Sequence, residues 1–349
     1  MKTVSFQLQT NRCMKFENHI GPFKERLKSI RLDLLPEHPY SLQYLQRLLR
    51  HQDYYLSIYA KAFNLACSKS NIPVAETCLL DYGSGNGLLG LFAKFSGFGE
   101  VVLLDHDREF MEGSMALAKQ LHIDISAGIT GDINDCGPFR PNIIIGTDVI
   151  EHVYNPSLFF QTIRQLNPEM VTVFSTSSNP ENPMQRRKLE ALQRKDEYVG
   201  LSDAEAARTG DRPHPPYLRM RELMIRSMAP QLTVPDIRIL AELTRGMRKD
   251  DISEAVSLFL QDGSLPATPS HPYNTCHPRT GSWTERLLSL EEYTGIYKSS
   301  GFQLECLPGF YDSSKAFPLG SMNAVRNLGV NAMGLRFAPF IYLMGYPGI

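Results

Sequence analysis

The residues best suited to bind a reactive ligand form the stretch Asp-Tyr-Gly-Ser-Gly-Asn-Gly at positions 81–87. An apolar run ends at Asp81 and a second one resumes at Leu88, so the pattern predicts a strand, a tight turn and a helix. Gly83, Gly85 and Gly87 allow unusual backbone dihedrals and a close approach of the ligand. The free N–H groups at the helix start favour an anionic group, and the Asp81 carboxylate suits a ligand that also carries positive charge. The stretch indicates a nucleotide-sized ligand.

A second acid refines this interpretation. The short apolar run 101–104 has the composition of a buried parallel strand, and it ends at Asp105, twenty residues after Gly85. An acid at this place usually accepts hydrogen bonds from a ribose diol. Leu88 occupies the third glycine position of a dinucleotide fingerprint, which argues against NAD or FAD. The alternative is a glycine turn that only connects a strand to a helix.

With both acids in place, the chain resembles the class I S-adenosylmethionine-dependent methyltransferases. Residues 81–87 are similar to the first motif of that family, and Asp105 matches its ribose-binding acid. The third motif is matched at 130–133, the fourth strand and the loop after it at 142–153, and the fifth strand at 171–176. The run Asp-Val-Ile-Glu-His-Val at 148–153, followed by Asn-Pro, resembles the branch that includes the ubiquinone-pathway O-methyltransferases. The resemblance covers residues 76–178 and resumes near Ser282.

The resemblance implies S-adenosylmethionine as the cofactor and assigns a set of contacts to it. Asp132 would meet the adenine amino group, and the backbone N–H of Ile133 would meet the ring. His152 follows the fourth strand and could take a proton from a hydroxyl acceptor, although a positioning or packing role is the alternative. The complete expected set of cofactor contacts is Asp81, Gly83, Gly85, Gly87, Asp105, His106, Asp132, Ile133 and Thr147.

Composition limits the other classes of function. The chain has 349 residues and a formal charge of −1, which gives no reason to expect nucleic-acid or anionic-membrane binding. Six scattered cysteines suggest neither a zinc site nor a disulfide framework, and no apolar stretch is long enough to span a membrane. His271, Cys276 and His277 lie close together but beside prolines, so we expect a fixed loop there and no metal. A cytoplasmic location follows.

The pattern of elements predicts an α/β fold with a doubly wound, mostly parallel seven-stranded sheet, Rossmann-like as in the methyltransferases. Residues 1–75 read as a helical N-terminal cap, with Tyr54, Tyr55 and Tyr59 either lining a lid over the cofactor or packing in the core. Residues 76–178 read as the cofactor-binding half of the core. A large helical insertion at 179–279, with helices near 185–195, 218–228 and 237–260, would form either a lid or a structural, dimer-forming unit. Residues 280–349 would complete the sheet with a helix at 290–300 and strands at 302–307 and 340–344.

The predicted function is methyl transfer from S-adenosylmethionine, by in-line displacement, to the oxygen of a small or carrier-linked organic acceptor. Such a reaction needs alignment, exclusion of water and removal of a proton, but no covalent nucleophile and no metal. The alternatives are a non-catalytic nucleotide-binding or scaffold protein with the same fold, and an NAD-dependent oxidoreductase. The acceptor cannot be read from the sequence, and a homodimer is possible.

Overall fold

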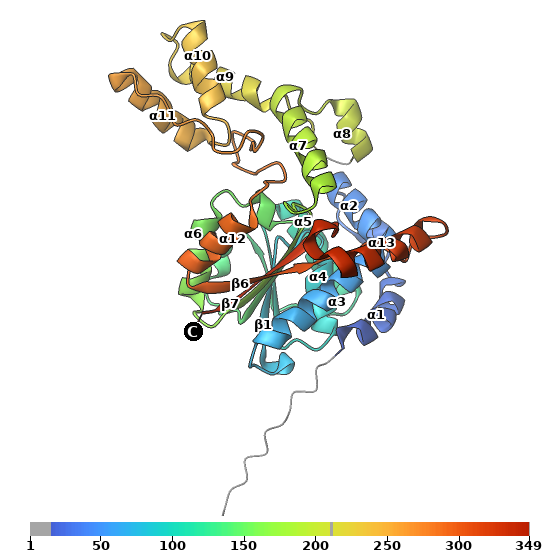
Figure 1. The fold of residues 1–349 in the computed structure, drawn as a ribbon. Helices are drawn as coiled ribbons and strands as arrows, with labels where there is room; N and C mark the ends of the chain where they lie inside the picture. The colour runs from blue at the N-terminus through green and yellow to red at the C-terminus, as the bar shows by residue number, and fades with distance from the viewer. Residues whose placement is uncertain (1–14, 210–211, 349) are drawn as a thin grey trace, which may run out of the picture.

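The computed structural model describes residues 15–209 and 212–348 (Figure 1). Its centre is a seven-stranded sheet with the order β3-β2-β1-β4-β5-β7-β6. The strands are β1 (Cys78–Tyr82), β2 (Glu100–Asp105), β3 (Ala127–Thr130), β4 (Ile143–Thr147), β5 (Val171–Thr176), β6 (Phe302–Pro308) and β7 (Ile341–Pro347). Strands β1 to β5 pair in parallel, and β7 pairs antiparallel to both β5 and β6. The predicted α/β sheet of seven strands is confirmed.

Register brings the ends of the first four strands together. Leu79 of β1 lies opposite Val101 of β2 and Ile143 of β4, so the three strands run side by side toward the same edge. Every residue of β1 is buried, because the strand is central and helices cover both of its faces. Parallel strands buried on both faces read as continuous apolar runs, as the sequence does here. The carboxyl ends of β1 to β4 therefore form one edge.

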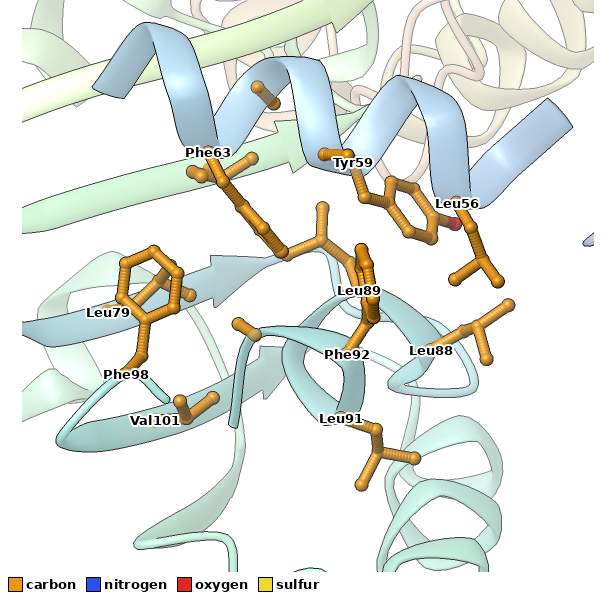
Figure 2. Packing of buried hydrophobic residues seen from close by; sticks show 14 of the residues in the cluster. Leu56, Tyr59, Phe63, Leu79, Leu88, Leu89, Leu91, Phe92, Phe98 and Val101 are labelled. Atoms are coloured by element: carbon orange, nitrogen blue, oxygen red, sulfur yellow. The ribbon is translucent and has the colours of Figure 1, made fainter. Parts of the chain in front are cut away.

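Alternate residues of the strands enter two different cores. One face, with Leu79, Val101 and Ile145, packs against α1 (Ile20–Leu27), α2 (Pro39–Arg50), α3 (Gln52–Lys69), α4 (Leu88–Phe95) and α5 (Arg108–Gln120). Figure 2 shows Tyr59 and Phe63 of α3 meeting Phe92 of α4 above β1 and β2. The other face packs against α6 (Pro156–Leu166) and α12 (Leu290–Ser299). Short 3-10 helices complete the chain at Phe16–His19, Leu32–Leu34, Val74–Glu76, Ile133–Cys136, Ile150–His152 and Gly334–Arg336.

The helical pattern expected before residue 76 is confirmed for the described residues, whereas residues 1–14 lie outside them. Helix α3 carries the predicted apolar face, and its residues Leu56, Tyr59 and Phe63 are all buried. Core packing is therefore the role of Tyr59, while Tyr54 and Tyr55 are only half-buried. The segment does pack on the sheet domain, since an amphipathic helix cannot bury its apolar stripe alone.

Five helices stand between β5 and α12: α7 (Pro183–Tyr198), α8 (Asp203–Thr209), α9 (Tyr217–Met228), α10 (Val234–Leu243) and α11 (Lys249–Asp262). Helices α9 to α11 share a small core of their own around Ile225, Leu240 and Ile252, and Figure 1 shows them standing away from the sheet beyond α7. The single helix expected over 237–260 is wrong. Gly246, at φ +82°, breaks it between α10 and α11, and a side chain there would meet the Trp283 ring.

The last helix, α13 (Leu319–Met333), lies between β6 and β7 and was not predicted. Its apolar residues Leu319, Val325 and Leu328 are exposed, so the helix shows little of the buried stripe from which a helix is recognised in a sequence. None of the helices in the described ranges combines the length and the apolar character needed to cross a membrane.

Candidate active site

The glycine-rich loop joins β1 to α4, and its three glycines have the left-handed backbone that the sequence implied. Their φ values are +67° at Gly83, +51° at Gly85 and +73° at Gly87. A Cβ on Gly83 would stand 2.5 Å from Cγ2 of Val149, and one on Gly87 would stand 2.8 Å from Cβ of Ser114. Both positions therefore need glycine for conformation and for space.

Asp81 lies beneath this loop, almost fully buried. Its Oδ2 accepts a hydrogen bond of 2.8 Å from the backbone N–H of Gly90, in the first turn of α4. Burial raises the pKa of Asp81 to about 7, the Gly90 hydrogen bond lowers it, and the charge of Asp105 raises it further. A carboxylate at a helix start is stabilised by the free N–H groups there. Asp81 thus holds the loop to the helix.

Asp105, at the tip of β2, ties the glycine loop to its own strand. Its Oδ2 accepts from the backbone N–H of Gly85 at 2.8 Å, and its Oδ1 accepts from the N–H of Asp107 at 2.9 Å. The carboxylate is 5% exposed, and each of its oxygens has a second lone pair available. The neighbouring His106 points into solvent, with Nδ1 3.5 Å from Oδ1 of Asp105.

Asp132 and Ile133 follow β3 and start a short helix. Oδ1 of Asp132 accepts from the N–H of Ile133 at 2.6 Å and from the hydroxyl of Tyr82 at 3.1 Å. The N–H that was expected to meet an adenine ring is therefore engaged by the Asp132 side chain itself. The Asp132 side chain is exposed, and its hydrogen bond to Tyr82 connects it to the tip of β1. Asp81, Asp105 and Asp132 thus lie on one connected edge, not on separate surfaces.

The loop after β4 places Thr147, Asp148 and His152 beside this edge. Asp148 has φ +50°, a strained backbone for a residue other than glycine, and its N–H donates to the carbonyl oxygen of Ser175 at 2.9 Å. Solvent reaches its side chain, yet the surrounding protein desolvates it enough to raise its pKa, and the charge of Glu285 raises it further. The sequence analysis assigned no contact to Asp148, although its place directly after a strand tip was a usable signal.

His152 is oriented by the chain that returns from the insertion. Its Nδ1 lies 2.7 Å from the carbonyl oxygen of Trp283, which can only accept, so Nδ1 carries the hydrogen. The lone pair of the neutral ring is then on Nε2. Next to it, Glu151 is buried, and burial together with the charges of Glu285 and Asp148 raises its pKa well above the usual range. Burial and the neighbouring carboxylates thus disfavour the charged form of Glu151.

Four tyrosines of the N-terminal helices surround Asp148: Tyr44, Tyr54, Tyr55 and Tyr59. Burial raises the pKa of each phenol, and the negative charge of Asp148 raises it further. The negative charge of Asp81 also raises the pKa of the Tyr59 phenol. A Cβ on Gly85 would lie 3.5 Å from the Tyr44 ring, so α2 covers the loop directly.

Two buried polar atoms of the glycine loop lack a partner among the described residues: the hydroxyl oxygen of Ser84 and the amide oxygen of Asn86. The amide nitrogen of Asn86 donates to the Ser41 side chain at 2.9 Å, which fixes α2 to the loop. Buried polar atoms normally have a hydrogen-bond partner, so the loop presents polar groups that a bound ligand could satisfy. This fits a polar, nucleotide-sized ligand at the loop.

The insertion reaches the same edge through one arginine. Nη2 of Arg212 lies 3.0 Å from Oδ2 of Asp107, directly after Asp105 and His106. Helices α9 to α11 lie farther from the sheet in Figure 1, whereas α7 begins close to it, where the Gln185 side chain donates to the carbonyl oxygen of Pro339 at 2.6 Å. In the part of the chain that the structure describes, no three His, Cys, Asp or Glu side chains are grouped so as to hold a metal ion.

No protein-family model and no curated protein sequence matches the chain. A solved S-adenosylmethionine-dependent methyltransferase from Clostridium acetobutylicum is similar at 10% identity and a TM-score of 0.45, over 88% of this chain and 98% of that one. Another from Mesorhizobium loti is similar at 14% identity and a TM-score of 0.40, over 80% and 95% of the two chains. Coclaurine N-methyltransferase, solved with N-methylheliamine and SAH, has 17% identity and a TM-score of 0.29, over 34% and 35%. With TM-scores from 0.29 to 0.45, these similarities leave the function to be argued from the site itself.

Proposed function

We propose that this protein is an S-adenosylmethionine-dependent methyltransferase. One observation carries the proposal: the carboxyl ends of β1 to β4 bring a glycine loop, Asp105, Asp132 and His152 to one edge. In open α/β sheets, ligands bind outside the carboxyl ends of the strands, where neighbouring connections leave in opposite directions. Here β1 has β2 on one side and β4 on the other, which places that point at the glycine loop.

Two of the acids expected to meet the cofactor support the proposal, whereas the N–H of Ile133 is already engaged by Asp132. The second lone pairs of Asp105 suit a ribose diol, and the exposed Asp132 carboxylate suits an adenine amino group. The unpartnered Ser84 hydroxyl suits the amino-acid part of the molecule, whereas the N–H groups of the three loop glycines already donate to groups of the protein. When bound, S-adenosylmethionine supplies an electrophilic methyl group on a positively charged sulfur.

We propose that the methylated atom is an oxygen, as in the ubiquinone-pathway branch that the motif at 148–153 resembles. Nε2 of His152 would accept the proton of the acceptor hydroxyl as that oxygen displaces the neutral thioether from the methyl carbon. The contact between Nδ1 and Trp283 keeps the ring in the required tautomer and orientation. Helix α2 would help to exclude water from the reacting atoms, because it places the Tyr44 ring over the loop.

The remaining parts of the proposal concern organisation. Residues 76–178 hold the cofactor, residues 280–349 complete the sheet, and residues 179–279 act as a lid through the contact of Arg212 with Asp107. The acceptor is a small or carrier-linked organic molecule. Scattered cysteines without paired spacing support a cytoplasmic location.

The test is transfer of a labelled methyl group. Purified protein is incubated with S-adenosylmethionine that carries an isotopic methyl group, together with fractions of a cell extract. Mass spectrometry then searches for a product heavier by one labelled methyl group. A product that forms with the wild type and not with His152→Ala supports the proposal. Binding of S-adenosylhomocysteine without any turnover favours a non-catalytic scaffold, and binding of NADH alone favours an oxidoreductase.

A further inference from the structure

Two adjoining clefts lie beside the candidate active site, between the N-terminal half of α3 and the segment that leads from β6 into α13. Their volumes are about 310 Å³ and about 430 Å³, and His51, Asp312 and Lys315 line both. Neither cleft is lined by the glycine loop. They are therefore separate from the expected place of the cofactor.

Two tyrosines connect the clefts to Asp148. Tyr54 and Tyr55 line the first cleft, with their ring centroids 5.9 Å apart. The ring of Tyr55 in turn lies 6.4 Å from the ring of Tyr59 between centroids. Burial raises the pKa of Tyr54 and of Tyr55, and the negative charges of Asp148 and Asp312 raise both further. Tyr54 is fixed there, because its hydroxyl donates to the carbonyl oxygen of Phe310 at 3.0 Å.

The outer walls of the clefts carry unneutralised positive charge. Within residues 15–209 and 212–348, no carboxylate lies within ion-pair distance of Arg50, Lys315 or Arg326. Of the two acids in the walls, Asp53 pairs with Lys24. Asp312 accepts from the backbone N–H and the hydroxyl of Ser314, and its single negative charge faces three cations. Residues 313–349 contain three arginine or lysine residues and no aspartate or glutamate. The walls thus favour an anion.

Arg326, in the wall of the first cleft, is positioned by an aromatic ring. The guanidinium carbon of Arg326 lies 5.4 Å from the centroid of Tyr311, and Nη1 donates to the Asn323 side chain at 3.1 Å. Arginine presents five N–H donors in a planar fork, which matches the geometry of a carboxylate or a phosphate. The Asn323 bond leaves most of these donors available.

We propose that this tyrosine-lined cleft binds the methyl acceptor, and that the acceptor is an anion whose carboxylate or phosphate lies against Lys315 and Arg326. This inference rests on the proposed function and names the substrate class of the same site. The anionic end is held at the outer wall, and the nucleophilic end passes Tyr54 and Tyr55 toward His152. Electrostatic focusing by the cleft also speeds capture of such an acceptor, and the effect weakens as salt screens the charges.

The test measures the charge of the methylated product and the effect of removing the positive charges of Lys315 and Arg326. Labelled methyl transfer into extract fractions is measured first, and the product is run on an anion exchanger at neutral pH. Rates at varied concentrations of the active fraction are then compared for the wild type, for Lys315→Ala combined with Arg326→Ala, and for Lys315→Arg. Lys298→Ala, at an exposed site on α12, is the matched control.

The expected result is an anionic product, with kcat/KM reduced at least tenfold in the double variant through KM. We expect Lys315→Arg and Lys298→Ala to stay close to the wild type, and 0.5 M salt to reduce the advantage of the wild type. A neutral or cationic product, or a double variant with unchanged KM, overturns this inference and leaves the methyltransferase intact. Absence of transfer together with absence of S-adenosylhomocysteine binding overturns the proposed function instead, and this inference with it.

Discussion

Asp105→Asn is the substitution that most directly probes how the proposed cofactor is held. The carboxylate accepts from the N–H groups of Gly85 and Asp107 at 2.8 and 2.9 Å, one on each oxygen. Asparagine keeps the shape but has a single acceptor oxygen, so one N–H faces an NH₂ group instead. The proposed hydrogen bond from the ribose diol loses its charged acceptor at the same time.

The magnitude follows from the charge of the acceptor. A hydrogen bond to a charged group contributes about 1.5–3 kcal/mol. Losing one such bond to the ribose therefore weakens binding by about 10- to 150-fold, since about 1.4 kcal/mol corresponds to a factor of ten. Isothermal titration calorimetry with S-adenosylhomocysteine measures the change, and Asp124→Asn at an exposed position before β3 serves as the control. A folded Asp105→Asn protein that binds within twofold of the wild type would refute the assignment of Asp105.

Three further predictions follow from the structure. Burial raises the pKa of Asp81 from its ordinary value of 3.8 to about 7 in the folded state. Between pH 3.8 and about pH 7 the folded state therefore binds more protons than the unfolded state, so the free energy of unfolding falls as the pH rises through this interval. Asp81→Asn should remove up to about 1.4 kcal/mol per pH unit of that decline, measured by urea unfolding at pH 4.5, 6 and 8, and an unchanged slope would contradict the buried carboxyl. His152→Gln should lower kcat by about 10²- to 10⁴-fold while binding of S-adenosylhomocysteine changes little, and a full rate would exclude His152 as the base. Glu197→Gln removes one partner of the buried pair with Arg221 and should cost about 3–5 kcal/mol in denaturant unfolding, whereas Glu242→Gln, in an exposed pair, should cost less than about 1 kcal/mol; equal effects would refute the difference in burial.

The edge formed by the carboxyl ends of β1 to β4 was predictable because the sequence signals for it are local. Glycine readily adopts the positive φ that Gly83 and Gly87 show, so the residue type itself indicates this backbone. An acid at the end of an apolar run indicates the end of a strand. The two strands expected at 302–307 and 340–344 are present as β6 and β7, and β7 pairs antiparallel to both β5 and β6. Features that depend on residues close together in the sequence, such as this turn and these strand ends, were therefore predicted.

Other features depend on contacts between distant residues. The break between α10 and α11 occurs where Gly246 meets Trp283, a neighbour that no helical periodicity reveals. Likewise, the cleft combines Tyr54 of α3 with Tyr311 and Arg326, which lie more than 250 residues later. The orientation of His152 depends on the carbonyl group of Trp283, 131 residues away. Local patterns carry no information on such approaches, since they follow from how the helices pack on the sheet.

The central claim is that the tips of four parallel strands bind an adenosyl sulfonium compound. Calorimetric titration of the full chain with S-adenosylmethionine, and separately with NADH, tests it most directly. The account predicts saturable one-to-one binding of S-adenosylmethionine and no measurable heat with NADH. Tight binding of NADH, with no binding of S-adenosylmethionine at millimolar concentration, would contradict it.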